Sequence, residues 1–183
     1  MQDLENRDRA QRASRRMALA TRVLMAIVLL APVVAAVWFA IDRAPFEALA
    51  RARFGPTTSL SSALQLTLIA AVLLVQAGLL AAALNALASA FQHLAARDPL
   101  NASAARAMRA SGMLLGLATL AAIALQVPLS YAVTMLNGPG ARAISVAISS
   151  GHIVGLFAAA ALIAIGHVLT LAAEVRADQK QFV

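Results

Sequence analysis

This sequence has no cysteine, few aromatic residues and few charged residues. The absence of cysteine excludes disulfides, thiolate metal ligands and thiol nucleophiles. Aromatic residues make up 4% of the chain, too few for the stacking platforms of a typical nucleic-acid-binding surface. Charged residues make up 13%, about half of their share in an average soluble domain. These shortages argue against a soluble redox, zinc-thiolate or nucleic-acid-binding protein.

What fills the chain instead is a set of four long apolar stretches. They run from about 22 to 41, 62 to 90, 110 to 136 and 143 to 171. Each reaches the roughly 20 residues that a helix needs to cross the hydrocarbon layer of a bilayer. Hydrophobic residues make up 61% of the 183 residues. The sequence predicts an all-α polytopic membrane protein with four transmembrane helices in an antiparallel bundle. That domain (22–171) lies between a basic N-terminal segment (1–21) and an amphipathic tail (172–183).

The positive charge is concentrated in the N-terminal segment, the second loop and the tail. These parts carry Arg7, Arg9, Arg12, Arg15, Arg16, Arg22, Arg97, Arg106, Arg109, Arg176 and Lys180. The first and third loops carry fewer basic residues, namely Arg43, Arg51, Arg53 and Arg142. Because basic residues favour the cytoplasmic side of a membrane, we expect both termini and the second loop to be cytoplasmic.

The abundance of alanine and arginine favours a bacterial source, and therefore a multi-pass protein of the inner (cytoplasmic) membrane. A cleaved signal peptide is a less favoured alternative for the first apolar stretch. Its uncharged run, 23–41, has 19 residues, longer than the apolar core of a typical signal peptide.

Proline and amphipathic spacing predict local features within this plan. Pro32 and Pro128 lie inside the first and third predicted spans, where each removes a backbone hydrogen bond and should kink its helix. In the first loop, Phe46, Leu49 and Ala50 have the spacing of a short amphipathic helix. We expect that helix to lie on the membrane surface.

Several amides and hydroxyls fall inside the predicted spans, which contain no charged residue in their interiors. Gln65, Gln76, Gln126 and Ser130 are the main examples. One interpretation is hydrogen bonding between helices, which contributes roughly 0.6–2 kcal/mol per contact. Under it, Gln76 and Gln126 both lie near mid-membrane and could bond to each other. The alternative is a polar path through a small transporter or channel subunit.

Two histidines lie 15 residues apart on the fourth predicted span, His152 and His167. A helix would place them about 22 Å apart, a spacing that two stacked haems could use. Each haem would need a second axial ligand, and the only other histidine is His93. Hydrogen-bonded histidines are therefore the favoured interpretation. Phosphate-binding glycine loops, HExxH, GxSxG and metal-ligand clusters are all missing. We predict no catalytic residue, no metal and no cofactor, and expect that the protein is not an enzyme.

Small residues recur at a spacing of four in the last two spans. Gly112 and Gly116 open the third span, and Gly151 and Gly155 lie in a small-residue stripe with Ala147 and Ala159 on the fourth. Such stripes allow helix backbones to approach closely in a membrane. We expect the third and fourth spans to pack on each other, or on a neighbouring subunit in a homo-oligomer.

Two segments resemble a known family. His93–Arg109 reads HLAARDPLNASAARAMR, and the tail from Leu171 reads LAAEVRADQKQFV. Both are similar to the DUF2975 family of bacterial four-helix membrane proteins. That family has a G-D-P-F turn followed by N-A and a helix with spaced arginines, and it ends in an amphipathic helix. Arg97 replaces the glycine of the turn, and Leu100 replaces the phenylalanine.

The resemblance implies a function through a partner. Members of this family are often encoded beside a small helix-turn-helix regulator, which implies a membrane protein that binds or restrains that regulator. The second loop and the tail would then supply the contacts, with Arg97, Asp98, Arg106, Arg109, Glu174 and Asp178 as candidates. The lipid bilayer is the other expected partner, and we do not expect the chain itself to bind nucleic acid.

Overall fold

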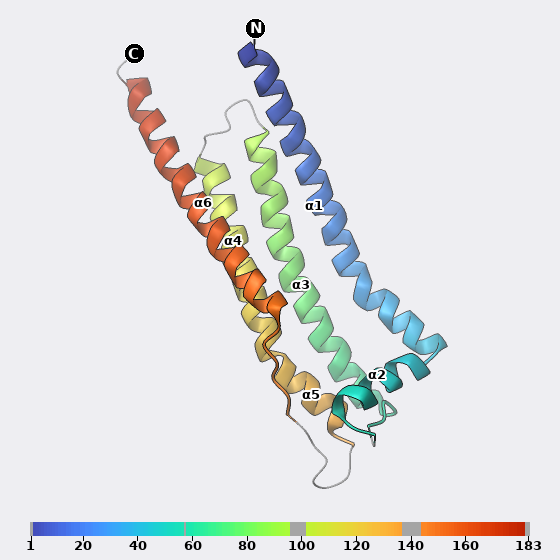
Figure 1. The fold of residues 1–183 in the computed structure, drawn as a ribbon. Coiled ribbons are helices and arrows are strands. Elements are labelled where there is room, and N and C mark those ends of the chain that lie inside the picture. Colours follow the sequence, from blue (N-terminus) through green and yellow to red (C-terminus); the bar gives the residue numbers. More distant parts are fainter. Residues whose placement is uncertain (1, 57, 96–101, 137–143, 182–183) are drawn as a thin grey trace.

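The protein is helical along most of its length (Figure 1). The computed structural model describes residues 2–56, 58–95, 102–136 and 144–181, with side chains between 11 and 176. Within these ranges the helices are α1 (Gln2–Ile41), α2 (Ala44–Phe54), α3 (Ala63–Leu94), α4 (Ala102–Ala124), α5 (Gln126–Thr134) and α6 (Ser150–Gln181). Four segments are long and apolar enough to cross a membrane, namely Gln11–Ile41, Ala63–Leu94, Ala102–Thr134 and Ser150–Arg176. The prediction of an all-α fold with four long apolar helices is confirmed.

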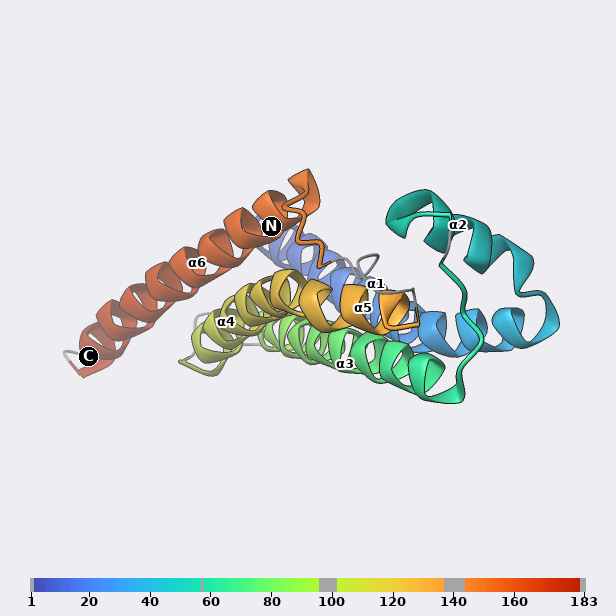
Figure 2. The same ribbon diagram turned by 90° about the horizontal axis from the view of Figure 1, so that it is seen from below.

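The long helices pack side by side in the order α1, α3, α4 and α6, and neighbours run antiparallel (Figure 1). Contact between α4 and α6 is the most extensive of the three pairings. In the described residues, α1 and α6 make no comparable contact with each other, so the row is open rather than closed. Figure 2 views the same row from the end that carries α2 and α5. Both termini lie at the opposite end, where α3 ends and α4 begins.

The interior of this row is built from small residues. Apart from one cluster at the α2 end, almost every buried apolar side chain is alanine: Ala18, Ala81, Ala83, Ala88, Ala90, Ala104, Ala105, Ala118, Ala132 and Ala159. Large aliphatic side chains point outward instead, as Leu30 and Ile153 do at 58% and 63% exposure. Lipid solvates such side chains as well as another helix would, so helices in a membrane gain most from close backbone approach. The pattern is that of helices surrounded by hydrocarbon.

Helix α1 is longer than its apolar stretch. It begins at Gln2 and continues through Pro32 to Ile41, so the basic segment 1–21 and the first predicted span form one helix. Within it, the Thr21 hydroxyl donates to the Met17 carbonyl at 2.8 Å, which satisfies that polar side chain locally. From Gln2 on, the N-terminal segment is therefore helically continuous with the first span.

The third span is broken where Pro128 predicts a kink. Helix α4 ends at Ala124 and α5 begins at Gln126, with Pro128 in the first turn of α5. A proline has no N–H to donate to the carbonyl four residues earlier, which here is that of Ala124, and its ring crowds that carbonyl. The break therefore falls four residues before the proline, and the two helices together form the third span.

The fourth span begins later than predicted. The apolar stretch from 143 suggested a helix, but residues 144–149 are not helical and α6 begins at Ser150. The reason is competition from α5 for the backbone of this segment. Gln126 bonds both backbone groups of Ala147, accepting from its N–H at 2.7 Å and donating to its carbonyl at 2.9 Å. The N–H of Ser145 donates to the Ser130 hydroxyl at 3.2 Å.

The predicted short helix in the first loop is present as α2. Its start is capped by Asp42, whose carboxylate accepts from the Ala44 N–H at 3.0 Å. It ends at Gly55, whose φ of 108° suits glycine and few other residues. Its location on the membrane surface stays a prediction, and its inner face packs on the protein, where Ala50 clusters with Leu60 and Val133. The partly buried apolar residues around this cluster are Phe39, Phe46, Phe54, Leu66, Ile69 and Leu129.

Glycines set the distance between α4 and α6. A Cβ on Gly112 would lie 2.8 Å from the Ala159 carbonyl oxygen and 2.9 Å from the Ile163 nitrogen. On Gly155 it would lie 2.7 Å from the Thr119 hydroxyl. Contacts this short mean that the two backbones nearly touch, as the small-residue spacing predicted for the third and fourth spans.

The other two glycines of the predicted stripe are less critical, and one outside it matters more. A Cβ on Gly116 would make ordinary contact with Ala159 at 3.6 Å. Gly151 takes no part in the contact between α4 and α6, since its nearest neighbour is Ser149 of its own segment. Gly166, which the sequence analysis did not select, packs against the backbone of Arg109 and Ala105. The close contact therefore runs from Gly155 to Gly166 on α6.

We predict that Gly112→Ala lowers the free energy of unfolding by about 1–3 kcal/mol, because the added methyl group overlaps the α6 backbone. Gly78→Ala is the matched control, since a Cβ there meets nothing within 4 Å. The control should leave stability unchanged or raise it by up to about 1 kcal/mol, because alanine is the better helix former. Thermal unfolding of both variants in one detergent measures the difference, and equal midpoints would contradict the prediction.

Candidate functional site

A pocket lined by both apolar and polar side chains lies at the α2 end of the molecule. It has a volume of about 500 Å³ and lies between α2, α5, the segment 144–149 and the start of α6. Its apolar lining comes mainly from α2 and α5, which also contribute the polar side chains of Arg53, Gln126 and Ser130. The other polar side chains, Ser145, Ser149 and His152, come from the segment before α6 and from its first turn. This arrangement of apolar walls with a few polar groups is typical of ligand pockets.

Most of these polar groups already have structural partners. Gln126 and Ser130 hold the segment 144–149 by the three hydrogen bonds described above. The His152 ring nitrogen Nδ1 accepts from the Ser149 N–H at 3.1 Å and lies 3.2 Å from the Ser149 hydroxyl. Ser149 precedes the first residue of α6 and His152 is its third, so His152 supplies one of the two bonds of a capping box, with histidine in place of glutamate. The His152 N–H itself donates to the Ser149 carbonyl at 3.0 Å. These side chains of the pocket are therefore held in place by hydrogen bonds with the backbone of the segment 144–149.

The histidines thus have different surroundings. His152 starts α6 through its bonds with Ser149, in line with a hydrogen-bonded histidine. His167 lies exposed on the same helix, three turns after the glycine at 155. The structure gives the two no common cavity in the described residues.

The other two glutamines act between helices. Fully buried Gln65 on α3 donates through Nε2 to the Val133 carbonyl of α5 at 2.8 Å. Gln76 donates to the Ala118 carbonyl of α4 at 3.2 Å. The expected bond between Gln76 and Gln126 is therefore wrong, because each amide binds backbone instead. Neither Gln65 nor Gln76 lines the pocket that Gln126 and Ser130 line.

One hydrogen bond between helices was not predicted from the sequence. Ser111 on α4 is buried and its hydroxyl donates to the Ala83 carbonyl of α3 at 3.1 Å. Its position beside Gly112, in the small-residue run, was the available signal. Together with Gln65 and Gln76, it links α3 to the third span at three levels.

Three of the residues proposed as partner contacts have described side chains, and these three lie at the other end in different surroundings. Arg106 is exposed and donates through Nε to the Ala102 carbonyl at 3.3 Å. Arg109 is half-buried against Gly166, between α4 and α6. Glu174 is exposed on α6. Arg97 and Asp98 lie outside the described residues, and Asp178 lies in α6 beyond the side chains that are described.

The same end carries an exposed apolar stripe on α6. Val168, Leu171 and Val175 on α6 are 64%, 62% and 58% exposed. Their spacing of three and four places them on one face of the helix.

Comparisons with protein-family models, with curated proteins and with solved structures found no match to this chain. The four apolar helices make it a multi-pass membrane protein.

We predict that Gln126→Leu frees the segment 144–149 from α5. Loss of both bonds to Ala147 should lower the free energy of unfolding by about 1–3 kcal/mol. It should also speed hydrogen exchange at the Ala147 amide, measured by mass spectrometry in detergent. Val127→Leu, an exposed neighbour on α5, is the control for added bulk. Unchanged exchange in Gln126→Leu would show that the segment is held by other contacts.

Proposed function

We propose that this protein sits in the bacterial inner membrane with both termini in the cytoplasm and binds a small helix-turn-helix regulator there, restraining it. It would act as a binding protein rather than an enzyme. The kind of partner, a helix-turn-helix regulator, is inferred from the resemblance of the second loop and tail to the DUF2975 family. The observation that carries the proposal is the exposed apolar stripe Val168–Leu171–Val175 at the end where both termini lie.

The level of this stripe along the bundle supports a location beyond the hydrocarbon layer. Gly166 of α6 packs against Ala105 and Arg109, close to the start of α4 at Ala102. Residues of α6 after about 170 therefore pass the end of α4. From there to Gln181 the helix continues for about 16 Å. Arginines cluster at this level on α1 and α4, as expected for the cytoplasmic boundary.

Helix α6 projects past α4 without a helix beside it in the described residues, and α1 projects similarly (Figure 1). Helical segments of this length are marginal in water unless an apolar face is covered. An exposed face with anchors three and four residues apart suits recognition of a helix in a partner's groove. Glu174 beside the stripe could then contact a basic DNA-binding partner, as could Asp178 if the partner extends along the tail.

A polar path for transport has less support. Gln65 and Gln76 bind backbone carbonyls of neighbouring helices, and Gln126 binds Ala147. These bonds are those of the interhelical interpretation. A small transporter or channel subunit remains the alternative, and solute flux in liposomes containing only this protein would favour it.

The test is co-purification from native membranes. We expect the tagged protein to retain a small DNA-binding protein in stoichiometric amount, and Leu171→Gln/Val175→Gln to lose it at least about tenfold, because polar side chains remove the apolar anchors. Truncation after Thr170 should do the same while keeping the α4–α6 contact that ends at Gly166.

The control makes the same chemical change at the other end of the molecule. Ile144→Gln/Val146→Gln replaces two equally exposed aliphatic side chains there and should leave co-purification intact. Retention of the regulator by the α6 variant, or by the truncated protein, would count against the proposal.

A further inference from the structure

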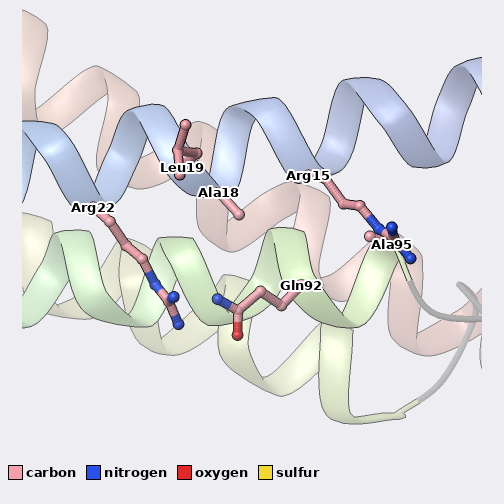
Figure 3. A pocket seen from close by; sticks show the side chains of 6 residues that line it. All are labelled: Arg15, Ala18, Leu19, Arg22, Gln92 and Ala95. Atoms are coloured by element: carbon pink, nitrogen blue, oxygen red, sulfur yellow. The ribbon is translucent and has the colours of Figure 1, made fainter.

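A groove with two arginines lies between α1 and α3, at the end where the termini lie (Figure 3). Its volume is about 370 Å³, and its lining is Arg15, Ala18, Leu19, Arg22, Gln92 and Ala95. Arg15 and Arg22 are seven residues apart, which is two helical turns, so they extend from the same face of α1. Figure 3 shows both side chains directed toward α3, with Gln92 between them. Ala18, at 4% exposure, forms the floor where the two helices meet.

Arg22 is oriented by a side chain of α3. When the Gln92 amide is turned by 180° from the orientation drawn in Figure 3, its oxygen accepts from Arg22 Nη2 at 2.6 Å and from Nε at 3.3 Å. A guanidinium has five N–H donors, so most of those on Arg22 stay available. The amide fixes the guanidinium in the groove without neutralising it.

The acidic side chains that the structure describes lie elsewhere. Asp42 and Glu47 are at the α2 end, and Glu174 is on α6, which does not pack on α1. Glu47 pairs with Arg51 at 2.7 Å. Neither Arg15 nor Arg22 has a carboxylate partner in the described part of the chain. The groove is therefore a preformed cationic site.

The position of the groove along the membrane normal matches the headgroup layer of a bilayer. The uncharged run 23–41 that follows Arg22 spans about 28 Å as a helix, close to the roughly 30 Å of the hydrocarbon core. Arg22 therefore lies at the edge of the hydrocarbon, and Arg15 lies about 10 Å farther out. Leu19, 67% exposed between them, offers an apolar contact to the upper part of an acyl chain.

We propose that this groove binds the phosphate group of an anionic phospholipid. Arginine suits that group because its planar fork donates two parallel hydrogen bonds to phosphate oxygens. A zwitterionic lipid carries the same phosphate, but its ammonium group would meet the two guanidinium charges. The groove therefore selects a headgroup with net negative charge. This site does not depend on a protein partner.

The experiment measures lipid binding to the purified full chain by native mass spectrometry, with phosphatidylglycerol and phosphatidylcholine in the same neutral detergent. We expect preferential binding of phosphatidylglycerol. Arg15→Gln and Arg22→Gln should each weaken it at least about tenfold, since each removes charge-assisted bonds to the phosphate.

Arg16→Gln is the matched control. It removes the same charge from the same helix at the same depth, but Arg16 does not line the groove. General attraction to an anionic surface predicts at most about a fivefold loss per arginine. Equal losses in Arg15→Gln and Arg16→Gln would overturn the site in favour of diffuse charge. Arg16→Gln is compared with Arg15→Gln and not with Arg22→Gln, because Arg22→Gln also breaks the contact with Gln92.

Inorganic phosphate separates a lipid from a soluble ligand. Millimolar phosphate should neither compete with phosphatidylglycerol nor raise the thermal midpoint of the protein. If millimolar phosphate displaced phosphatidylglycerol from the protein, the groove would be assigned to a soluble phosphate group. That result would overturn the lipid assignment.

Discussion

A bilayer offers no hydrogen-bond partner to the polypeptide backbone, and the structure of this protein follows from how that demand is met. Continuous helices satisfy their own amides and carbonyls, and most of the chain uses that solution. Where the helix is broken, side-chain amides take over. Gln126 serves both backbone groups of Ala147, and Gln65 serves the Val133 carbonyl near the end of α5. The glutamines that suggested a polar path thus bind backbone groups of neighbouring segments.

The second constraint is that lipid removes the usual reason to bury large apolar side chains. Helix pairs in hydrocarbon are held by close backbone approach and by a few polar ties. The interior of this row is accordingly alanine and glycine, and its largest fully buried side chains are polar, among them Gln65, Thr134 and Ser111. Among the described residues, the inner helices α3 and α4 each pack on two long neighbours, whereas α1 and α6 each pack on one. The row is therefore open, and the outer faces of α1 and α6 are left to lipid or to partners.

The two ends of the molecule are built differently. At one end, α2 folds over α3 and α5, and aromatic rings pack edge to face, as Phe39 and Phe46 do with centroids 5.5 Å apart. At the other end, α1 and α6 extend as separate helices that carry arginines and an exposed apolar stripe. The covered end encloses its own pocket, whereas the extended end offers surfaces to molecules in the headgroup layer and beyond it. This asymmetry is why we place the proposed interactions at the extended end.

The sequence by itself determined the fold class, the presence of the spans, the break at Pro128 and the helix in the first loop. Those features depend on local properties: runs of apolar residues, a missing N–H, and amphipathic spacing. The small-residue spacing of Gly112 and Gly155 likewise pointed to the contact between the last two spans. Only the tertiary structure decided the start of α6, because apolar residues 143–149 are compatible with helix until Gln126 and Ser130 of α5 bind their backbone. It also decided that Gly166, not Gly151, touches α4, and that Arg15, Arg22 and Gln92 meet in one groove. Each of these depends on which faces of helices distant in sequence come together, and that information is not carried by any local pattern.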